Sequence, residues 1–146
     1  MNQKGMIMCG IAGIMCLQRR NCDVNRAEKI VKHMTDLLAH RGPDGEGQLV
    51  IDGGHVFLGH RRLAIIDLTD KAKQPMQSLD KRFSVTFNGE IYNYRELKKE
   101  LELSGFHFTT NSDTEVLLKV YEAWGIAGIR KLNGIFAFAL WDDYKK

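Results

Sequence analysis

The almost wholly apolar run at residues 135–141 limits the fold of this chain more than any other segment. A short apolar run that stops at a turn, here Asp142-Asp143, is typical of a strand that is buried on both faces. Such a strand needs neighbouring strands in its sheet and further layers of structure against it. The sequence therefore predicts a sheet inside a layered domain, and we expect the native polypeptide to continue beyond residue 146.

Further strands are predicted by alternating or branched apolar residues bounded by turns. The strongest hairpin signal is Asp52-Gly53-Gly54, which separates two such runs. Residues 69–80 are polar and contain Pro75, so they are expected to form a loop, and Asn88-Gly89 is interpreted as a turn. The expected strands are residues 10–17, 48–51, 55–58 and 82–88, with another apolar run at 63–68.

Three helices are predicted from apolar residues that recur at helical spacing. Asn25 and Glu28 form the expected capping pair of the first, which must end near His40 because Gly42-Pro43 cannot continue it. Its inward face is predicted to hold Ala27, Ile30, Val31, Met34, Leu37 and Leu38.

The second helix is marked by Leu97, Leu101 and Leu103 and stops at Gly105. The third is capped by Ser112 or Asp113, turns Val116, Leu117, Val120 and Tyr121 inward, and ends at Gly125. Strands and helices are segregated rather than strictly alternating. This order favours an α+β layered fold over a doubly wound sheet.

Charge and hydropathy argue against nucleic acid and membranes as partners. The formal charge is +3, and Lys98-Lys99 lie among acidic residues, which is typical of a solvated helix face. No apolar run approaches the roughly 20 residues that span a bilayer, and no signal peptide is evident, so we expect a cytoplasmic protein. Cys16 and Cys22 have no zinc-site spacing and are interpreted as buried or incidental thiols.

Clusters of polar residues stand just outside the predicted strands, where loops can present side chains to a ligand. They lie at residues 8–10, 40–45, 60–62, 88–90 and 112–113. A cysteine before a glycine lets the backbone approach a substrate, and an Asn-Gly pair can donate two hydrogen bonds to an oxyanion. Taken singly these signals are weak, because His40 and His60 are more often structural and Asn-Gly more often marks a hairpin.

The order of these motifs is far more specific than any one of them. The chain contains Met-Cys-Gly-Ile-Ala-Gly, His-Arg-Gly-Pro-Asp-Gly, Gly-His-Arg-Arg-Leu-Ala-Ile-Ile-Asp, Gln-Pro-Met, Phe-Asn-Gly-Glu-Ile-Tyr-Asn-Tyr, Ser-Asp-Thr-Glu and Leu-Asn-Gly-Ile-Phe-Ala-Phe-Ala-Leu-Trp-Asp. Over residues 8–142 it resembles the class II glutamine amidotransferases, and within them the asparagine synthetase branch. The resemblance implies an N-terminal-nucleophile hydrolase fold, an αββα sandwich of two antiparallel sheets between helical layers.

The resemblance also implies a role for each matching residue. Cys9 matches the nucleophile, Arg62 the group that holds the glutamine α-carboxylate, and Asn88 and Gly89 the oxyanion hole. Glu90 and Asp113 match contacts to the α-amino end of glutamine, and Arg41 lies in a loop that borders the pocket. The backbone that lines the same pocket is expected at Leu63, Ala64, Ile65 and Ile66.

In this class the α-amine of the nucleophile is itself the proton acceptor, so residues 1–8 must be absent from the active form. Residues 1–8 are therefore predicted to be an N-terminal extension, and residues 9–146 an incomplete amidotransferase domain. Translation from Met8 followed by methionine removal is favoured, a cleaved propeptide comes second, and an inactive extended form is third.

Glutamine hydrolysis is expected to supply ammonia for asparagine synthesis from aspartate. The resemblance implies that a C-terminal synthetase domain would use ATP and Mg²⁺ and that the domain described by this sequence needs no cofactor or metal. The sequence leaves the oligomeric state open, with a homodimer as one candidate. Two alternatives stay open. The domain could serve another carboxylate acceptor, or it could be a non-catalytic regulatory or binding module of the same fold.

Overall fold

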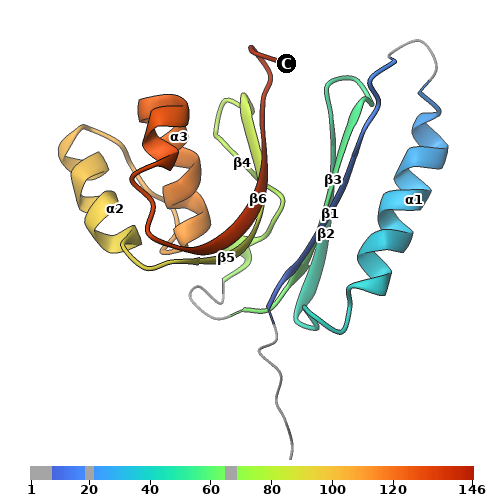
Figure 1. The fold of residues 1–146 in the computed structure, drawn as a ribbon, viewed down its shortest axis with the longest axis horizontal. Helices are drawn as coiled ribbons and strands as arrows, with labels where there is room; N and C mark the ends of the chain where they lie inside the picture. Colours follow the sequence, from blue (N-terminus) through green and yellow to red (C-terminus); the bar gives the residue numbers. More distant parts are fainter. Residues whose placement is uncertain (1–7, 19–21, 65–68) are drawn as a thin grey trace, which may run out of the picture.

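A computed structural model describes residues 8–18, 22–64 and 69–146 (Figure 1). The predicted N-terminal extension, apart from Met8, therefore lies outside the described residues, as do Ile65 and Ile66. In chain order the elements are β1 (Gly10–Met15), α1 (Val24–Leu37), β2 (Gly45–Ile51), β3 (Val56–Arg62), the 3-10 helix η2 (Asp70–Ala72), β4 (Met76–Gln77), β5 (Phe83–Ile91), α2 (Tyr94–Leu103), α3 (Asp113–Ile129) and β6 (Gly134–Asp142).

The strands form two antiparallel sheets with a helical layer outside each of them. The first sheet has the order β1-β3-β2 and the second β4-β5-β6. Figure 1 shows α1 against the outer face of the first sheet and α2 and α3 against the outer face of the second. The predicted αββα sandwich of the α+β class is therefore confirmed.

The larger part of the core lies between the second sheet and its two helices. Alternate residues of a strand point to one face. The residues of β5 that point to the outer face of the second sheet therefore pack on α2 and α3. The fully buried members include Val85, Ile91, Leu101, Val116, Leu117 and Val120. A smaller cluster of Ala27, Val31 and Phe57 joins α1 to the first sheet.

Helix α1 differs from its prediction at both its start and its buried face. Its N-cap is Asp23, whose side chain accepts a hydrogen bond from the Arg26 N–H at 3.0 Å, rather than the Asn25–Glu28 pair. The row that faces the sheet has a spacing of four and includes Ala27, Val31 and Thr35, whereas Ile30, Met34 and Leu37 are exposed. The periodicity did not identify Thr35 because it is polar. Its hydroxyl donates to the Val31 carbonyl at 2.6 Å, which satisfies it inside the core.

Strand β6 is not buried on both faces, contrary to the prediction. It is an edge strand whose burial alternates, and Ile135 is 64% exposed. Its Ala139 and Trp141 line an apolar groove between the two sheets, so that face is only partly covered by the first sheet.

The bounds of the remaining elements differ from the predicted bounds by a few residues. The predicted hairpin joins β2 and β3, and the loop at residues 69–80 contains η2 and the two-residue strand β4. Helix α3 is capped by Ser112 as predicted, but it continues to Ile129 past a kink at Gly125, where φ is +60°.

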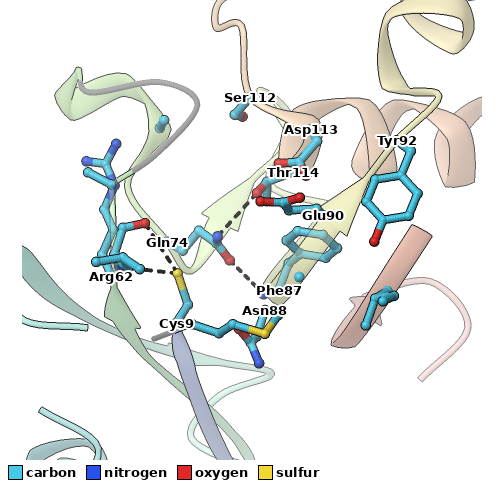
Figure 2. Close-up of a pocket in the computed structure, with 16 residues that line it drawn as sticks. Cys9, Arg62, Gln74, Phe87, Asn88, Glu90, Tyr92, Ser112, Asp113 and Thr114 are labelled. Atoms are coloured by element: carbon cyan, nitrogen blue, oxygen red, sulfur yellow. Dashed lines mark hydrogen bonds between the residues drawn. The ribbon is translucent and has the colours of Figure 1, made fainter. Parts of the chain in front are cut away.

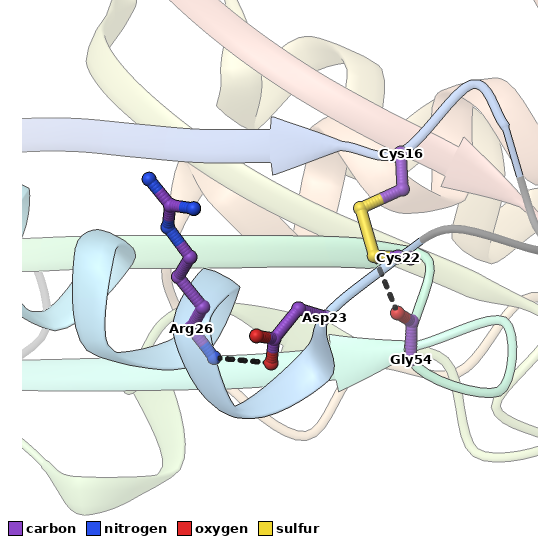
Figure 3. Close-up of a disulfide and its surroundings, with 5 residues drawn as sticks. All are labelled: Cys16, Cys22, Asp23, Arg26 and Gly54. Atoms are coloured by element: carbon purple, nitrogen blue, oxygen red, sulfur yellow. Dashed lines mark hydrogen bonds between the residues drawn. A yellow bond between two sulfur atoms is a disulfide. The ribbon is translucent and has the colours of Figure 1, made fainter.

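The interpretation of Cys16 and Cys22 as incidental thiols is wrong, because the structure joins them in a disulfide. The bond connects the residue after β1 to the segment just before α1 (Figure 3). The sequence did not reveal it because three cysteines leave the pairing open. Cys9 is the free cysteine among the described residues. In the same part of the chain, no helix is long and apolar enough to cross a membrane.

Candidate active site

A cavity of about 210 Å³ lies beside the start of β1, the end of β3, the middle of β5 and the first turn of α3 (Figure 2). This volume is below the range of about 300–1,000 Å³ that is typical of pockets for drug-sized ligands, so the cavity suits a smaller molecule. Every predicted site residue that the structure describes lines this cavity, namely Cys9, Arg62, Leu63, Ala64, Asn88, Gly89, Glu90 and Asp113. Ile65 and Ile66 lie outside the described residues.

The Cys9 thiol is partly buried and is held by the backbone at the end of β3. The Leu63 N–H donates to its Sγ at 3.2 Å. Burial raises the pKa of the thiol, while the Leu63 hydrogen bond and the charge of Arg62 oppose that rise. At neutral pH the thiol is therefore mostly protonated, and a nucleophilic role requires a base close by. On the other side, Arg41 Nε donates to the Cys9 carbonyl at 3.2 Å and fixes the backbone of the cysteine.

Neighbouring arginines of β3 have different partners because successive side chains point to opposite faces of the sheet. Arg61 forms ion pairs with Asp36 at 2.6 Å and Glu46 at 2.8 Å and donates to the Thr35 carbonyl. Arg62 lines the cavity, and its Nη1 donates to the Thr69 carbonyl at 3.1 Å. The alternation thus makes Arg61 a structural residue and places Arg62 at the site.

The loop before β2 braces this end of β3. The Asp44 N–H donates to the Arg62 carbonyl at 3.0 Å, and the Asp44 carboxylate accepts from the Ala64 N–H at 2.9 Å. A side chain at Gly42 would lie 2.3 Å from the Arg61 backbone, so only glycine fits there. The motif at residues 40–45 therefore shapes the cavity from behind, by holding the backbone of the residues that line it.

Asn88 and Gly89 lie inside β5 rather than in a turn, so that part of the sequence interpretation is wrong. They pair with Ala137 and Phe136 of β6. Gly89 has φ +150°, and an added Cβ would lie 2.3 Å from the Ile135 carbonyl oxygen. The glycine is therefore required by the backbone conformation and by the close approach of β6. The Asn88 side-chain oxygen is buried without a hydrogen-bond partner among the described residues.

The open edge of β5 presents its N–H groups to the cavity side of the sheet. The Phe87 N–H donates to Gln74 Oε1 at 2.6 Å and the Ile91 N–H to Asp113 Oδ2 at 3.1 Å. Because the N–H groups of a strand alternate between its two edges, the Gly89 N–H between them points to the same edge. It is a backbone donor beside the Asn88 amide.

Asp113 occupies the first turn of α3, where the helix dipole favours negative charge. Burial raises the pKa of its carboxyl and the hydrogen bond from the Ile91 N–H opposes this, while nearby Glu90 raises it further. The segment before it is fixed by Glu115, which accepts hydrogen bonds from the Thr109 and Thr110 N–H groups at 2.9 and 2.7 Å. Asp113 is thus a positioned carboxylate at the cavity wall.

Sequence reasoning missed several residues that line the cavity. Gln74, Phe87 and Thr114 form a hydrogen-bonded chain across it, and Met8, Ala72, Tyr92, Ser112 and Ile135 complete the wall. The signal for Gln74 was its place before Pro75 in the Gln-Pro-Met motif, but the motif alone assigns it no contact.

The arrangement surrounds one small space with a thiol, a cation, a carboxylate and a pair of amide donors. Figure 2 shows Arg62 on one side of the view and Asp113 with Glu90 on the other, with the Cys9 sulfur below. An arginine and a carboxylate so placed can hold the two charged ends of an amino acid. No cluster of histidine, cysteine, aspartate or glutamate suited to a metal ion occurs in residues 8–18, 22–64 and 69–146.

Comparison with known proteins agrees with this geometry. Residues 8–146 match a family described as a glutamine amidotransferase domain. Asparagine synthetase [glutamine-hydrolyzing] 1 of Bacillus subtilis is 42% identical over 135 residues, which is 92% of this chain and 21% of that protein. Amidase chry2 of Gibberella zeae is 37% identical over 145 residues, covering 95% of this chain and 22% of that protein.

A solved structure shares the fold. It is the glutamine phosphoribosylpyrophosphate amidotransferase of B. subtilis complexed with ADP and GMP, with a TM-score of 0.71 and 24% identity over 93% of this chain and 35% of that one. The chain spans about a fifth of the length of the curated relatives it matches.

Proposed function

The chain belongs to the glutamine amidotransferase domain family, and we propose that its Cys9 cavity hydrolyses the side-chain amide of L-glutamine to glutamate and ammonia. One observation carries the proposal. A single cavity of about 210 Å³ brings together the thiol of Cys9, the cation of Arg62, the carboxylate of Asp113 and the donors of Asn88 and Gly89. These are the groups needed to bind a free amino acid by both ends and to attack its amide.

Substrate selection follows from the charged ends of glutamine. Arg62 pairs with the α-carboxylate, and Asp113, with Glu90 beside it, accepts hydrogen bonds from the α-ammonium. Hydrogen bonds between charged groups are roughly twice as strong as neutral ones. A plain amide without these two charges would leave the buried Asp113 unpaired, which costs binding free energy.

The reaction begins with attack of the Cys9 thiolate on the side-chain carbonyl carbon of glutamine. Burial raises the pKa of this thiol, so a base must take its proton. The free α-amine of Cys9 is that base, because an α-amine titrates near ~7.7–8.0 and a thiol near ~8.5. The amine then passes the proton to the leaving ammonia, and water hydrolyses the thioester to glutamate and free thiol.

The tetrahedral intermediate carries its negative charge on the former carbonyl oxygen. The Asn88 side-chain amide and the Gly89 N–H donate hydrogen bonds to that oxygen. Preorganised donors of this kind are effective because they need no rearrangement as the charge develops, and the loss of one typically lowers the rate by about 10²–10³-fold.

The role of the α-amine makes the start of the mature chain decisive. While Met8 precedes Cys9, the nitrogen of Cys9 belongs to a peptide bond and has no basic lone pair. We propose that methionine removal after translation from Met8, or cleavage of a propeptide, exposes the amine.

The test compares ammonia release from L-glutamine by the chain that begins at Cys9 and by the chain that begins at Met1. We expect hydrolysis by the first form and none by the second, once mass spectrometry has verified each N-terminus. Cys9→Ala should abolish hydrolysis by the shorter form and leave its circular dichroism spectrum unchanged. An electrophilic glutamine analogue should label Cys9 in the shorter form.

Two results would contradict this proposal. Equal rates from the two N-terminal forms would show that the α-amine is not the base. Absence of both hydrolysis and labelling in the shorter form would favour a non-catalytic binding module.

We also propose that the ammonia serves ATP-dependent synthesis of asparagine from aspartate elsewhere in the whole protein. The support is that two B. subtilis relatives named as glutamine-hydrolyzing asparagine synthetases are 42% and 41% identical to this chain. Proteins named as amidases are 37% and 36% identical, which keeps another carboxylate acceptor as the second candidate. Product analysis of the whole protein supplied with glutamine, Mg²⁺-ATP and aspartate separates the two.

A further inference from the structure

The side chain of Gln74 takes the place of a strand beside the catalytic part of β5. Strand β4 pairs with β5 only at Met76↔Val85 and Gln77↔Ser84, so within the described part of the chain no strand lies against the edge of β5 beyond Val85. At the next position on that edge, the Phe87 N–H donates to Gln74 Oε1 at 2.6 Å. The side-chain amide thus supplies the acceptor that a continued β4 would have supplied.

The other end of the same amide reaches helix α3. Gln74 Nε2 donates to Thr114 Oγ1 at 3.2 Å, and Thr114 is buried. Gln74 therefore connects the strand residue directly before Asn88 to the helix residue directly after Asp113 (Figure 2).

The backbone around Gln74 and Phe87 is fixed from the first sheet. A Cβ at Gly47 of β2 would lie 2.0 Å from the Gln74 carbonyl oxygen, so this glycine allows the loop to lie against the sheet. His60 Nε2 donates to the Phe87 carbonyl at 3.2 Å. The Gln74 backbone and Phe87 are consequently held against the first sheet, and Thr114 belongs to α3.

We propose that Gln74 is a positioning residue that sets the distance between the oxyanion donors of β5 and the ammonium-binding carboxylate of α3. The inference rests on the proposed glutaminase function. Gln74 contacts Phe87 and Thr114, and through them it aligns Gly89 and Asp113. The Gln74 side chain thereby places the side-chain amide of glutamine over the Cys9 thiol while Asp113 binds the α-amino end of the substrate.

The two hydrogen bonds of Gln74 act on different steps. The bond to Phe87 orients the peptide that precedes Asn88 and Gly89, so its loss lowers kcat. The bond to Thr114 orients the first turn of α3, so its loss raises KM. A displacement of about 1 Å in such a site can cost about 10²-fold in rate, so effects of about tenfold or more are expected.

The test is steady-state kinetics of ammonia release by three variants of the form that begins at Cys9. Gln74→Met keeps the side-chain length and removes both bonds, so kcat should fall about tenfold or more and KM should rise. Thr114→Val removes only the second bond, so KM should rise while kcat stays near the wild-type value. Gln77→Met is the matched control, because Gln77 of β4 also donates to a residue of β5, Ser84 Oγ at 3.1 Å, and does not line the cavity. It should leave both constants unchanged.

The double variant Gln74→Met/Thr114→Val supplies the decisive comparison. If the two residues act through one bridge, Thr114→Val should have no further effect on KM in the Gln74→Met background. Wild-type kinetics in Gln74→Met, additive effects in the double variant, or a fall in kcat alone for Thr114→Val would overturn the inference. These results leave the proposed function intact, whereas a wild-type protein that releases no ammonia refutes both. Thr114→Val tests the bridge even if Gln74→Met does not fold.

Discussion

At the scale of single residues, the site depends on charged and polar groups held in a partly buried wall. Asp113 illustrates this. Its carboxylate accepts a hydrogen bond from the Ile91 N–H at 3.1 Å and sits in the first turn of α3, which compensates part of the cost of burying a charge. Burial nevertheless raises its pKa. An ammonium group next to this carboxylate would stabilise its charged form, and the α-ammonium of glutamine is such a group.

The first prediction concerns the charge of Asp113. Asp113→Asn keeps an oxygen for the Ile91 N–H but removes the negative charge, so KM for glutamine should rise about 10- to 100-fold, since a hydrogen bond to a charged group is worth about 1.5–3 kcal/mol. The value of kcat at saturation should change much less. Because the carboxyl must be ionised and its pKa is raised, wild-type KM should also rise as the pH falls toward that pKa.

The control for this variant is Asp142→Asn. Asp142 is an equally buried carboxylate, but it pairs with Arg82 at 3.1 Å and does not line the cavity. It should lower stability and leave KM unchanged. Glutamine saturation curves measured at several pH values check both variants, and an unchanged KM in Asp113→Asn would count against the assignment of the ammonium site.

At the scale of elements, the site is made by a strand whose neighbour stops early. Strand β5 is paired with β6 along its whole length, while β4 covers only two of its residues. The uncovered edge offers backbone N–H groups to side chains and to a ligand, which a strand paired along the whole of both edges could not do. On the side of β6, Gly89 is required because β6 approaches it too closely for any side chain.

The second prediction tests that close approach. Gly89→Ala places a Cβ 2.3 Å from the Ile135 carbonyl oxygen, so β5 and β6 must separate, and both stability and ammonia release should be lost. Gly105→Ala is the matched control, because Gly105 also has a positive φ, +89°, but has no atom within 4 Å of an added Cβ. Gly105→Ala should lower the free energy of unfolding by only about 1 kcal/mol, because alanine is disfavoured in the left-handed backbone conformation.

Urea denaturation measures the free energy of unfolding of both glycine variants. Equal losses in the two would show that backbone conformation alone, without the contact to β6, explains the requirement for glycine at Gly89.

At the scale of the whole molecule, the two sheets are joined by buried polar contacts next to the site. His60 Nε2 donates to the Phe87 carbonyl at 3.2 Å, and Thr86 Oγ1 donates to the Gly59 carbonyl at the same distance. His60 is 1% exposed, and burial lowers its pKa to about 4 despite the hydrogen bond to Phe87. The histidine is therefore neutral in the folded protein and structural, as its isolated sequence context indicated.

The third prediction is the pH dependence that follows from His60. Its pKa in the unfolded chain is near 6.5, so below this pH the unfolded state binds the proton first and the folded state loses stability. The loss should reach about 3 kcal/mol as the pH falls from about 6.5 to about 4, because each pKa unit corresponds to about 1.4 kcal/mol. Above pH 6.5 the histidine should contribute no pH dependence.

The measurement compares urea denaturation of the wild type and of His60→Gln across this range. Glutamine can still donate to the Phe87 carbonyl but does not titrate, so the difference between the two curves isolates His60 from the carboxyl groups. Parallel curves would contradict the neutral, buried histidine.

The sequence by itself determined the fold class, the order of the elements and the residues that meet at the site. Period-two runs, a hairpin at Asp52-Gly53-Gly54 and a cap at Ser112 or Asp113 are local signals, and they predict an α+β layered fold. The αββα sandwich itself was implied by the resemblance of the ordered motifs to a known family. The residues around the cavity were predicted from the same resemblance, because each of them matches a position in the ordered motifs.

The tertiary structure alone decided which contacts those residues make. Asn88-Gly89 is part of a strand because residues of β6 that lie 47 and 49 positions further along the chain pair with it, which no local turn signal can indicate. The Cys16–Cys22 disulfide, the buried Thr35 and the Gln74 bridge also depend on what lies opposite each residue in space. Local pattern fixes the conformation of a segment, whereas pairing across sheets and between distant segments depends on the packing of the whole chain.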